Sequence, residues 1–322
     1  MYSYIDMHCD TLLQTLHKGS SLLYENEGMQ SLKLMHEAKQ MCQFFAIFFP
    51  PRQENKENPT PTDEEFFRIL CRNFYEEIEK HPYTVAFAHN YDDIRKNWEK
   101  GLSSAILTVE DGRMVDGKME NLKMLYEQGV RAIALTWNFS NCFGYPNSED
   151  KSIMQKGLTD FGKDALAEMN QRGILIDVSH LSDGGFYDVA LLSKKPFIAS
   201  HSNCRALTPH SRNMTDDMIR TLAEHGGVAG LNFYSEFVNS RRDGVTSVED
   251  LVAHVMHFIK IGGEDCIGIG TDYDGIENVP EISNPTQMLL LFDALQKKGV
   301  TPRQLDKLAS GNVLRVIKEA MK

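Results

Sequence analysis

The stretch "IDMHCDT" (residues 5–11) is a short apolar run that ends in two polar side chains, and runs like it decide the fold. Residues i and i+2 of a strand point to the same side, so His8 and Asp10 are expected on one side and Cys9 on the other. An imidazole nitrogen and a carboxylate oxygen on one side suit a divalent cation of borderline softness. A single pair of this kind is also common in structural roles, so its meaning depends on the other strands.

Similar apolar runs recur along the whole chain and alternate with amphipathic helical stretches. They are rich in Ile, Val, Leu and Phe without strict alternation, which is typical of strands buried on both faces. Eight of them fit a closed parallel barrel: 4–8, 43–49, 103–110, 130–137, 173–180, 196–201, 226–234 and 266–272. The pattern predicts an α/β fold, a (β/α)8 TIM barrel, as one domain over residues 1–322.

Three further segments complete the predicted architecture. The run 83–89 also has the composition of a strand, and because the barrel has only eight places we expect it to be an accessory strand. The polar, proline-rich stretch 50–63 is expected to be a loop. The segment 285–322 is expected to form three helices that cover the barrel.

Composition limits the classes of partner. The formal net charge is −11, which argues against nucleic acid or an anionic membrane surface. There is no run of about 18 apolar residues, so no membrane span is expected. No signal peptide is visible either, and the six cysteines are scattered without a CxxC pair. A reduced, cytoplasmic protein is therefore expected.

Residues that can bind metals or move protons finish four more of the predicted strands, namely Glu110, His180, His201 and Asp272. In barrels of this kind the strand ends meet at one face, where the chemistry gathers. We therefore expect these side chains to lie close to His8, although they are far apart in sequence.

Five ligands are too many for one tetrahedral zinc ion and suit two ions that share a carboxylate. Glu110 is the natural bridge, because a glutamate can offer one oxygen to each ion. His8 and Asp10 would complete one site, and His180 and His201 the other. Two ions roughly 3.5–4 Å apart can hold a hydroxide between them, which would attack a carbonyl or phosphoryl centre.

Six motifs together resemble the membrane (renal) dipeptidase family, the M19 peptidases: "DMHCDT", "TVEDG", "DVSHLSD", "SHSNCRAL", "HSRNMTDDMI" and "GIGTDYDG". They cover nearly the whole chain, in order and with similar spacing. The resemblance implies a barrel of the metal-dependent hydrolase type that cleaves dipeptides with a binuclear zinc centre. It also implies that His8, Asp10 and Glu110 hold one zinc, and that Glu110, His180 and His201 hold the other.

The resemblance assigns further roles to single positions. Arg212 would bind the substrate carboxylate, which a guanidinium can grip with two parallel hydrogen bonds, and Tyr234 would lie near the same end. Asp272 would transfer the proton and face the substrate amine. One position departs from the family, because Trp137 replaces a histidine that steadies the developing oxyanion. Trp137 or Asn138 could contact the oxyanion instead, or Trp137 could narrow the substrate pocket.

Two alternatives to a zinc dipeptidase remain open. Another binuclear barrel hydrolase would act on cyclic amides, lactones or phosphoesters, but the lysine that usually marks such enzymes is missing from "AIALTWNFSN". A homologue that has lost turnover and only binds peptides is the other, and Trp137 is its support. Members of the family are often dimers, so the resemblance also implies a homodimer.

Overall fold

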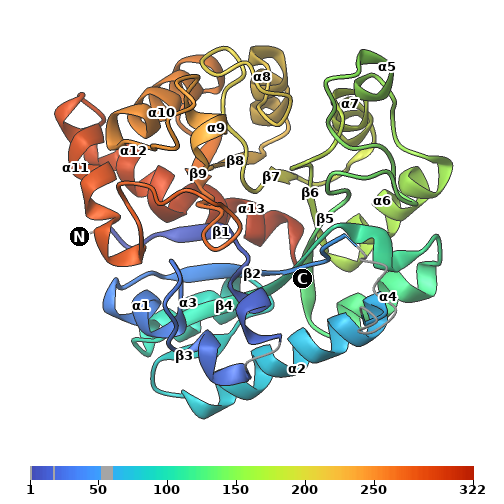
Figure 1. Cartoon of the computed structure of the whole chain (residues 1–322), viewed down its shortest axis with the longest axis horizontal. Coiled ribbons are helices and arrows are strands. Elements are labelled where there is room, and N and C mark those ends of the chain that lie inside the picture. The colour runs from blue at the N-terminus through green and yellow to red at the C-terminus, as the bar shows by residue number, and fades with distance from the viewer. Residues whose placement is uncertain (1, 17–18, 52–60) are drawn as a thin grey trace.

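Eight parallel strands close into a barrel in the computed structural model, which describes residues 2–16, 19–51 and 61–322 (Figure 1). Each strand pairs with its two neighbours, and the pairing of β2 with β4 closes the ring. The predicted TIM barrel is thus confirmed. The barrel strands are β1 (Ile5–Cys9), β2 (Cys42–Phe48), β4 (Ser103–Glu110), β5 (Val130–Ala134), β6 (Leu175–Asp177), β7 (Ile198–Ala199), β8 (Val228–Leu231) and β9 (Ile267–Ile269).

The ninth strand, β3 (Val85–Phe87), lies outside the ring, as expected. It pairs with the first residues of β4, from Ser103 to Ala105. Strand β5 pairs with β4 only from Leu107 onward. Because β4 is eight residues long, one of its edges accommodates β3 and β5 in succession.

Helices cover the outside of the barrel (Figure 1). Most begin with a side chain that accepts a backbone N–H bond, and α2 and α10 begin with capping boxes at Thr62 and Ser247. Most of the loop expected over 50–63 lies outside the described residues. The helices before the C-terminal segment are α1 (Leu32–Glu37), α2 (Asp63–Lys80), α3 (Tyr91–Glu99), α4 (Met119–Glu127), α5 (Lys151–Met154), α6 (Asp160–Arg172), α7 (Asp183–Leu192), α8 (Asp216–Glu224), α9 (Ser235–Val238) and α10 (Val248–Gly262).

The C-terminal segment contributes α11 (Leu289–Lys297), α12 (Pro302–Asp306) and α13 (Asn312–Ala320). Val313, Val316 and Ile317 of α13 pack with apolar residues at the first positions of the barrel strands, such as Ile5 and Val228. Helix α13 therefore closes the N-terminal end of the barrel and leaves the opposite end for a site.

Strand β1 contains a bulge that decides where the opening motif points. Asp6 lies opposite Gln43 and Cys9 lies opposite Phe45, so β1 has one residue more than β2 over this interval. Ile5 and Met7 both face the inner cluster, and simple alternation from them would turn His8 outward. The extra residue turns His8 inward instead, while Cys9 packs in the outer apolar layer with the helices.

Of the helices that the structure describes, none combines the length and the apolar character needed to cross a membrane. All six cysteines lie within the described residues, and none forms a disulfide.

Candidate metal centre

The predicted ligands converge at the C-terminal end of the barrel around the carboxylate of Glu110, the last residue of β4. Its Oε2 lies 3.5 Å from His8 Nε2. Its Oε1 lies 2.9 Å from His180 Nε2 and 3.5 Å from His201 Nε2. The two oxygens of one carboxylate therefore face two different groups of ligands, as a bridging glutamate requires.

The first group surrounds His8. Its Nε2 lies 3.5 Å from Asp10 Oδ2 and 3.7 Å from Asp272 Oδ1. Within the part of the chain that the structure describes, His8 Nε2 and Asp10 Oδ1 are buried polar atoms without a hydrogen-bond partner. Leaving such an atom unpaired costs about 1–3 kcal/mol, so these atoms fit the ligands of a cation. Asp272 was predicted for proton transfer, yet its distance to His8 and Asp10 also allows it to be a ligand.

The second group is a pair of histidines whose Nε2 atoms lie 3.0 Å apart, on His180 and His201. The Nδ1 of His180 bonds Asn138 Oδ1 at 3.1 Å, and the Nδ1 of His201 bonds Ser200 Oγ at 2.7 Å. An amide oxygen can only accept, so His180 donates from Nδ1 and its Nε2 keeps a free lone pair. Both imidazoles therefore present Nε2 to the position that a shared metal would occupy.

Three residues at the ends of strands adopt left-handed backbone conformations. The φ angles of Asp111, His180 and Asp272 are 72°, 67° and 64°. The predicted strands ended at His180, His201 and Asp272, which is wrong, because β6 ends at Asp177, β7 at Ala199 and β9 at Ile269. Non-glycine residues rarely adopt positive φ, and such conformations gather at functional sites. His180 and Asp272 line the cavity at the end of the barrel, whereas Asp111 accepts hydrogen bonds from Asn141 and Arg113.

The electrostatics of the site reflect crowded carboxylates. Burial and the neighbouring Asp10 raise the pKa of Glu110 to about 8. Burial and Asp10 likewise raise the pKa of Asp272 to about 6. Burial opposes the charging of His8, but Glu110 and Asp10 raise its pKa well above the ordinary value. The site therefore favours an added positive charge, which bound divalent ions would supply.

The two facing histidines behave in the opposite way. Burial, followed by the positive charges of Arg212 and His8, lowers the pKa of His180 and of His201 well below the ordinary value. A neutral imidazole is the form that binds a metal. Nitrogen and carboxylate oxygen donors in this arrangement fit the zinc ions that the sequence predicts.

A cavity of about 380 Å³ opens above these residues. The predicted substrate residues Trp137, Asn138 and Tyr234 line it, as do Asp10, Glu110, His180 and Asp272. Phe48 and Phe237 add an aromatic surface, and the ring of Phe48 meets the ring of Trp137 edge to face at 4.9 Å. Sequence reasoning missed both phenylalanines, because nothing in their local pattern separates them from core residues.

Arg212 is buried and is not among the described side chains that line this cavity. Its Nη2 donates to the carbonyl of His201 at 3.2 Å, and its guanidinium lies 5.3 Å from the ring of Phe237. Its Nε has no partner in the part of the chain that the structure describes. Burial lowers the pKa of Arg212 to about 10, so it stays cationic at neutral pH.

Asn232, which follows β8, was not predicted from the sequence. Its Nδ2 donates to Asp272 Oδ2 at 2.9 Å and to the carbonyl of His201 at 3.3 Å. Its Oδ1 accepts the N–H of Tyr234, two residues on. Asp6 and Asp177 accept the N–H two residues on in the same way. Asp177 is the last residue of β6 and Asn232 directly follows β8, and an Asp or Asn at the end of a predicted strand was the signal in the sequence.

Asp274, His254 and His257 also carry groups that can bind a metal or move a proton, but these groups have other partners. Asp274 also lines the cavity, but it accepts hydrogen bonds from Thr11 and from the N–H of Met29, which favours Asp272 for proton transfer. His254 and His257 bind different partners, Cys204 and Asp216.

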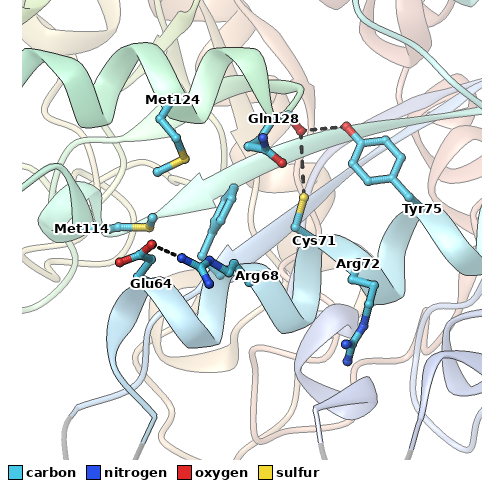
Figure 2. Close-up of a pocket in the computed structure, with 9 residues that line it drawn as sticks. Glu64, Arg68, Cys71, Arg72, Tyr75, Met114, Met124 and Gln128 are labelled. Carbon is cyan, nitrogen blue, oxygen red and sulfur yellow. Dashed lines mark hydrogen bonds and ion pairs between the residues drawn. The ribbon is translucent and has the colours of Figure 1, made fainter.

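A second cavity, of about 400 Å³, lies between α2 and α4 (Figure 2). Its charged residues Glu64 and Arg68 pair with each other, and the carbonyl of Gln128 accepts bonds from Tyr75 and Cys71. Its polar groups are thus satisfied within the protein, in contrast to those around Glu110.

Comparison with known proteins identifies the family. The sequence profile of membrane dipeptidase (peptidase family M19) matches residues 2–322. An uncharacterised protein encoded in the pqqA 5′ region of Klebsiella pneumoniae is 36% identical over 234 residues, which cover 70% of this chain and 85% of that protein. An uncharacterised dipeptidase of Schizosaccharomyces pombe, C965.12, is 30% identical over 299 residues, covering 88% and 70%.

Among solved structures, a metallopeptidase from Rhodobacter sphaeroides with a bound phosphinate mimic of the dipeptide L-Ala-D-Ala superposes with a TM-score of 0.88. It is 26% identical, and the match covers 99% of both chains. The resemblance drawn from the six motifs is thereby confirmed.

Proposed function

Because this chain belongs to the membrane dipeptidase family (peptidase family M19) and is a metallo-dipeptidase, we propose that it hydrolyses dipeptides with two zinc ions. The ligands would be His8, Asp10, Glu110, His180 and His201. The carboxylate of Glu110 carries the proposal, because one oxygen faces His8 and the other faces the two remaining histidines. When bound there, two zinc ions would activate water and polarise the scissile carbonyl.

Asp272 is the proposed proton carrier. Its carboxylate lines the cavity next to the ligands, and the amide of Asn232 fixes its orientation by donating to Oδ2. Burial raises the pKa of Asp272 to about 6 in the protein without metal, which is close to neutral pH. An acid with a pKa near the working pH can take a proton from water and pass it to the leaving amine.

Arg212 and Tyr234 are the proposed partners of the free substrate carboxylate. Arg212 is a buried cation whose Nε has no partner among the described residues, and it contacts Phe237, which lines the cavity. A buried guanidinium attracts a carboxylate strongly because little solvent screens the charge. The demand for a carboxylate at this depth would restrict the enzyme to two-residue peptides.

The configuration of the second residue of the dipeptide is another property of the substrate. The similar Rhodobacter sphaeroides metallopeptidase is bound to a mimic of L-Ala-D-Ala. We propose that this chain accepts dipeptides with either an L- or a D-residue at the second position. Trp137 and Asn138, which line the cavity, would contact the substrate. The homodimer and the cytoplasmic location expected from the sequence stay predictions.

A dipeptide panel tests the function. The panel contains L,L and L,D dipeptides, a tripeptide, a cyclic amide, a lactone and a phosphodiester, and bound zinc is measured in the same samples. We expect cleavage of dipeptides alone, its loss on chelation and its return with zinc. Cleavage of a cyclic amide, lactone or phosphodiester instead of dipeptides would support another barrel hydrolase. A sample with two zinc ions that cleaves nothing would support a protein that only binds peptides.

A further inference from the structure

Two buried aspartates join neighbouring strands beside the candidate metal centre with the same pattern of hydrogen bonds. In the first, Asp6 Oδ1 accepts the backbone N–H groups of His8 at 3.2 Å and Thr271 at 3.0 Å. The other oxygen, Oδ2, accepts the hydroxyl of Thr271 at 2.6 Å. The bonds tie β1 to the end of β9, where Asp272 follows directly.

In the second, Asp177 Oδ1 accepts the N–H groups of Ser179 and Ser200, both at 2.9 Å. Its Oδ2 accepts the hydroxyl of Ser200. The bonds tie β6 to the end of β7, where His201 follows directly. The two networks are alike in each bond, and the hydroxyl residue precedes a residue of the metal centre in both.

The networks differ in the second group that bonds to the hydroxyl, besides the aspartate. The Thr271 hydroxyl accepts the N–H of Tyr273 at 3.2 Å, which is backbone. The Ser200 hydroxyl lies 2.7 Å from Nδ1 of His201, a predicted ligand. A hydroxyl has one proton, and Ser200 gives it to Asp177, so the bond to His201 requires that Nδ1 carries the hydrogen. Nε2 then keeps the lone pair that a metal needs.

We propose that Asp177 is a positioning residue that acts through the Ser200 hydroxyl to hold His201 in the tautomer with hydrogen on Nδ1. The inference rests on the proposed function, because His201 is a ligand only if the metal centre is real. The intermediary, Ser200, was not predicted from the sequence. Partners of this kind, behind a metal ligand, orient the ring and select its tautomer.

The substitution Asp177→Asn should reverse the chain of hydrogen bonds. The amide oxygen of asparagine can still accept the two N–H groups, which leaves its NH₂ facing Ser200. The hydroxyl must then accept from that NH₂ and give its own proton elsewhere. The nearest acceptor is His201 Nδ1 at 2.7 Å, whereas Ser179 Oγ lies at 3.3 Å. His201 would then carry its hydrogen on Nε2 and lose the lone pair.

Zinc affinity tests the proposal, measured by competition with a chromophoric chelator on the full chain. We expect Asp177→Asn to weaken zinc binding by about 10- to 100-fold. Asp6→Asn is the matched control, because it makes the same change in the same network without a histidine on the hydroxyl, and its loss should be clearly smaller. Ser200→Ala should cause a modest loss, since it frees the tautomer without inverting it.

The double variant D177N/S200A gives the sharpest readout. Without the hydroxyl, asparagine cannot impose the wrong tautomer, so the double variant should bind zinc more tightly than Asp177→Asn alone. A purely structural role predicts that the two losses accumulate, and that result would overturn the proposal. Equal losses in Asp177→Asn and Asp6→Asn would overturn it too. A wild-type protein that binds no zinc would instead refute the proposed function.

Circular dichroism and a thermal melt establish whether each variant is folded. If Asp177→Asn does not fold, the comparison passes to Ser200→Ala against Thr271→Val, which remove the two corresponding hydroxyls. Ser200→Ala should then show the weaker zinc binding, and equal affinities would contradict the proposal.

Discussion

At the scale of the residue, Glu110 is the point where two groups of ligands meet. A glutamine at this position is neutral. It keeps one acceptor oxygen for one group of ligands, but it turns an NH₂ group toward the other group. We expect Glu110→Gln to lose at least one zinc ion and to lower kcat/KM on the order of 10²–10³-fold or more. Glu277→Gln is the control, because Glu277 lines the same cavity but belongs to neither group of possible metal ligands among the described residues.

Metal analysis and steady-state kinetics measure these effects. If Glu110→Gln keeps full zinc occupancy and a near-normal kcat/KM, Glu110 does not bridge two ions.

Arg212 offers a test of substrate recognition. Lysine keeps the charge but loses the planar pair of donors, so we expect Arg212→Lys to raise KM by about 10-fold or more with a smaller change in kcat. Arg220→Lys on the surface of α8 is the matched control. A dipeptide amide, which lacks the carboxylate, should be a poor substrate for wild type and Arg212→Lys alike. If Arg212→Lys damages hydrolysis of the amide as much as that of the acid, Arg212 has another role.

Single residues were predictable where strand geometry fixes them. His8 and Asp10 could be placed on one side because alternation is a local property of the chain. Asn232 and Ser200 could not be found in the same way, because their roles depend on which strand end becomes the neighbour. Sequence likewise did not reveal that Arg212 lies behind Phe237 instead of on the cavity surface.

At the scale of the element, the ends of β7, β8 and β9 are packed backbone against backbone. A Cβ added to Gly230 would lie 1.8 Å from the carbonyl oxygen of Ser200, and one added to Gly270 would meet the same atom. We expect Gly230→Ala to lower the free energy of unfolding by about 3 kcal/mol and to weaken zinc binding, because the displaced backbone bears His201. Urea denaturation measures the first effect and chelator competition the second.

The control for this crowding is Gly144→Ala, whose Cβ would meet Leu158 at 3.4 Å, an ordinary contact. Gly144→Ala should leave zinc affinity unchanged. A Gly230→Ala variant as stable as wild type would show that the strand ends can move apart freely.

His254 joins α10 to the loop after β7 and to the last residue of α9, and it responds to pH. Its Nδ1 accepts the N–H of Cys204 and its Nε2 donates to the carbonyl of Val238. Burial lowers its pKa to about 4, below the ordinary 6.5. The unfolded chain therefore binds the proton more readily, and the stability that neutral His254 contributes is lost as pH falls from about 6.5 toward 4.

Between pH 7 and pH 5 this loss should reach about 2 kcal/mol. We expect His254→Gln to show a smaller fall in unfolding free energy over that interval than wild type, measured by urea denaturation at both values. His36→Gln, on the exposed side of α1, should fall as wild type does. An equal fall in unfolding free energy for wild type and His254→Gln would contradict this expectation.

Elements were predictable in kind and order but not in length. The apolar runs located all eight barrel strands because a strand buried on both faces needs a continuous apolar sequence. The apolar runs predicted β6 and β9 to be longer than they are, because the polar turns that follow these strands are buried too. The bulge in β1 left no trace in composition, since it is a property of pairing between two strands.

At the scale of the whole molecule, metal and fold should stabilise each other. Bound zinc stabilises the folded chain according to its concentration, by about 2.7 kcal/mol for one site at a hundred times Kd. We expect chelation to lower Tm on the order of 5–10 °C and to abolish hydrolysis. Returning zinc should restore both. A Tm that chelation leaves unchanged, with zinc shown to be gone, would contradict this coupling.

The barrel and the convergence of the candidate ligands could be predicted because topology brings every strand end to one face, whatever the sequence separation. The shape of the cavity could not, since Phe48, Trp137 and Phe237 take their places by packing against one another and against loops.

The first strand pairs with the last, and Asp6 bonds to Thr271 across 265 residues. During synthesis on the ribosome, the nascent chain therefore displays His8 and Asp10 long before their neighbours exist. Strand β1 can pair with β2 early, but its other edge has no partner until β9 has been synthesised. We therefore expect the barrel to close late in synthesis, and a fragment that ends before β9 would lack the Asp6–Thr271 bonds beside His8.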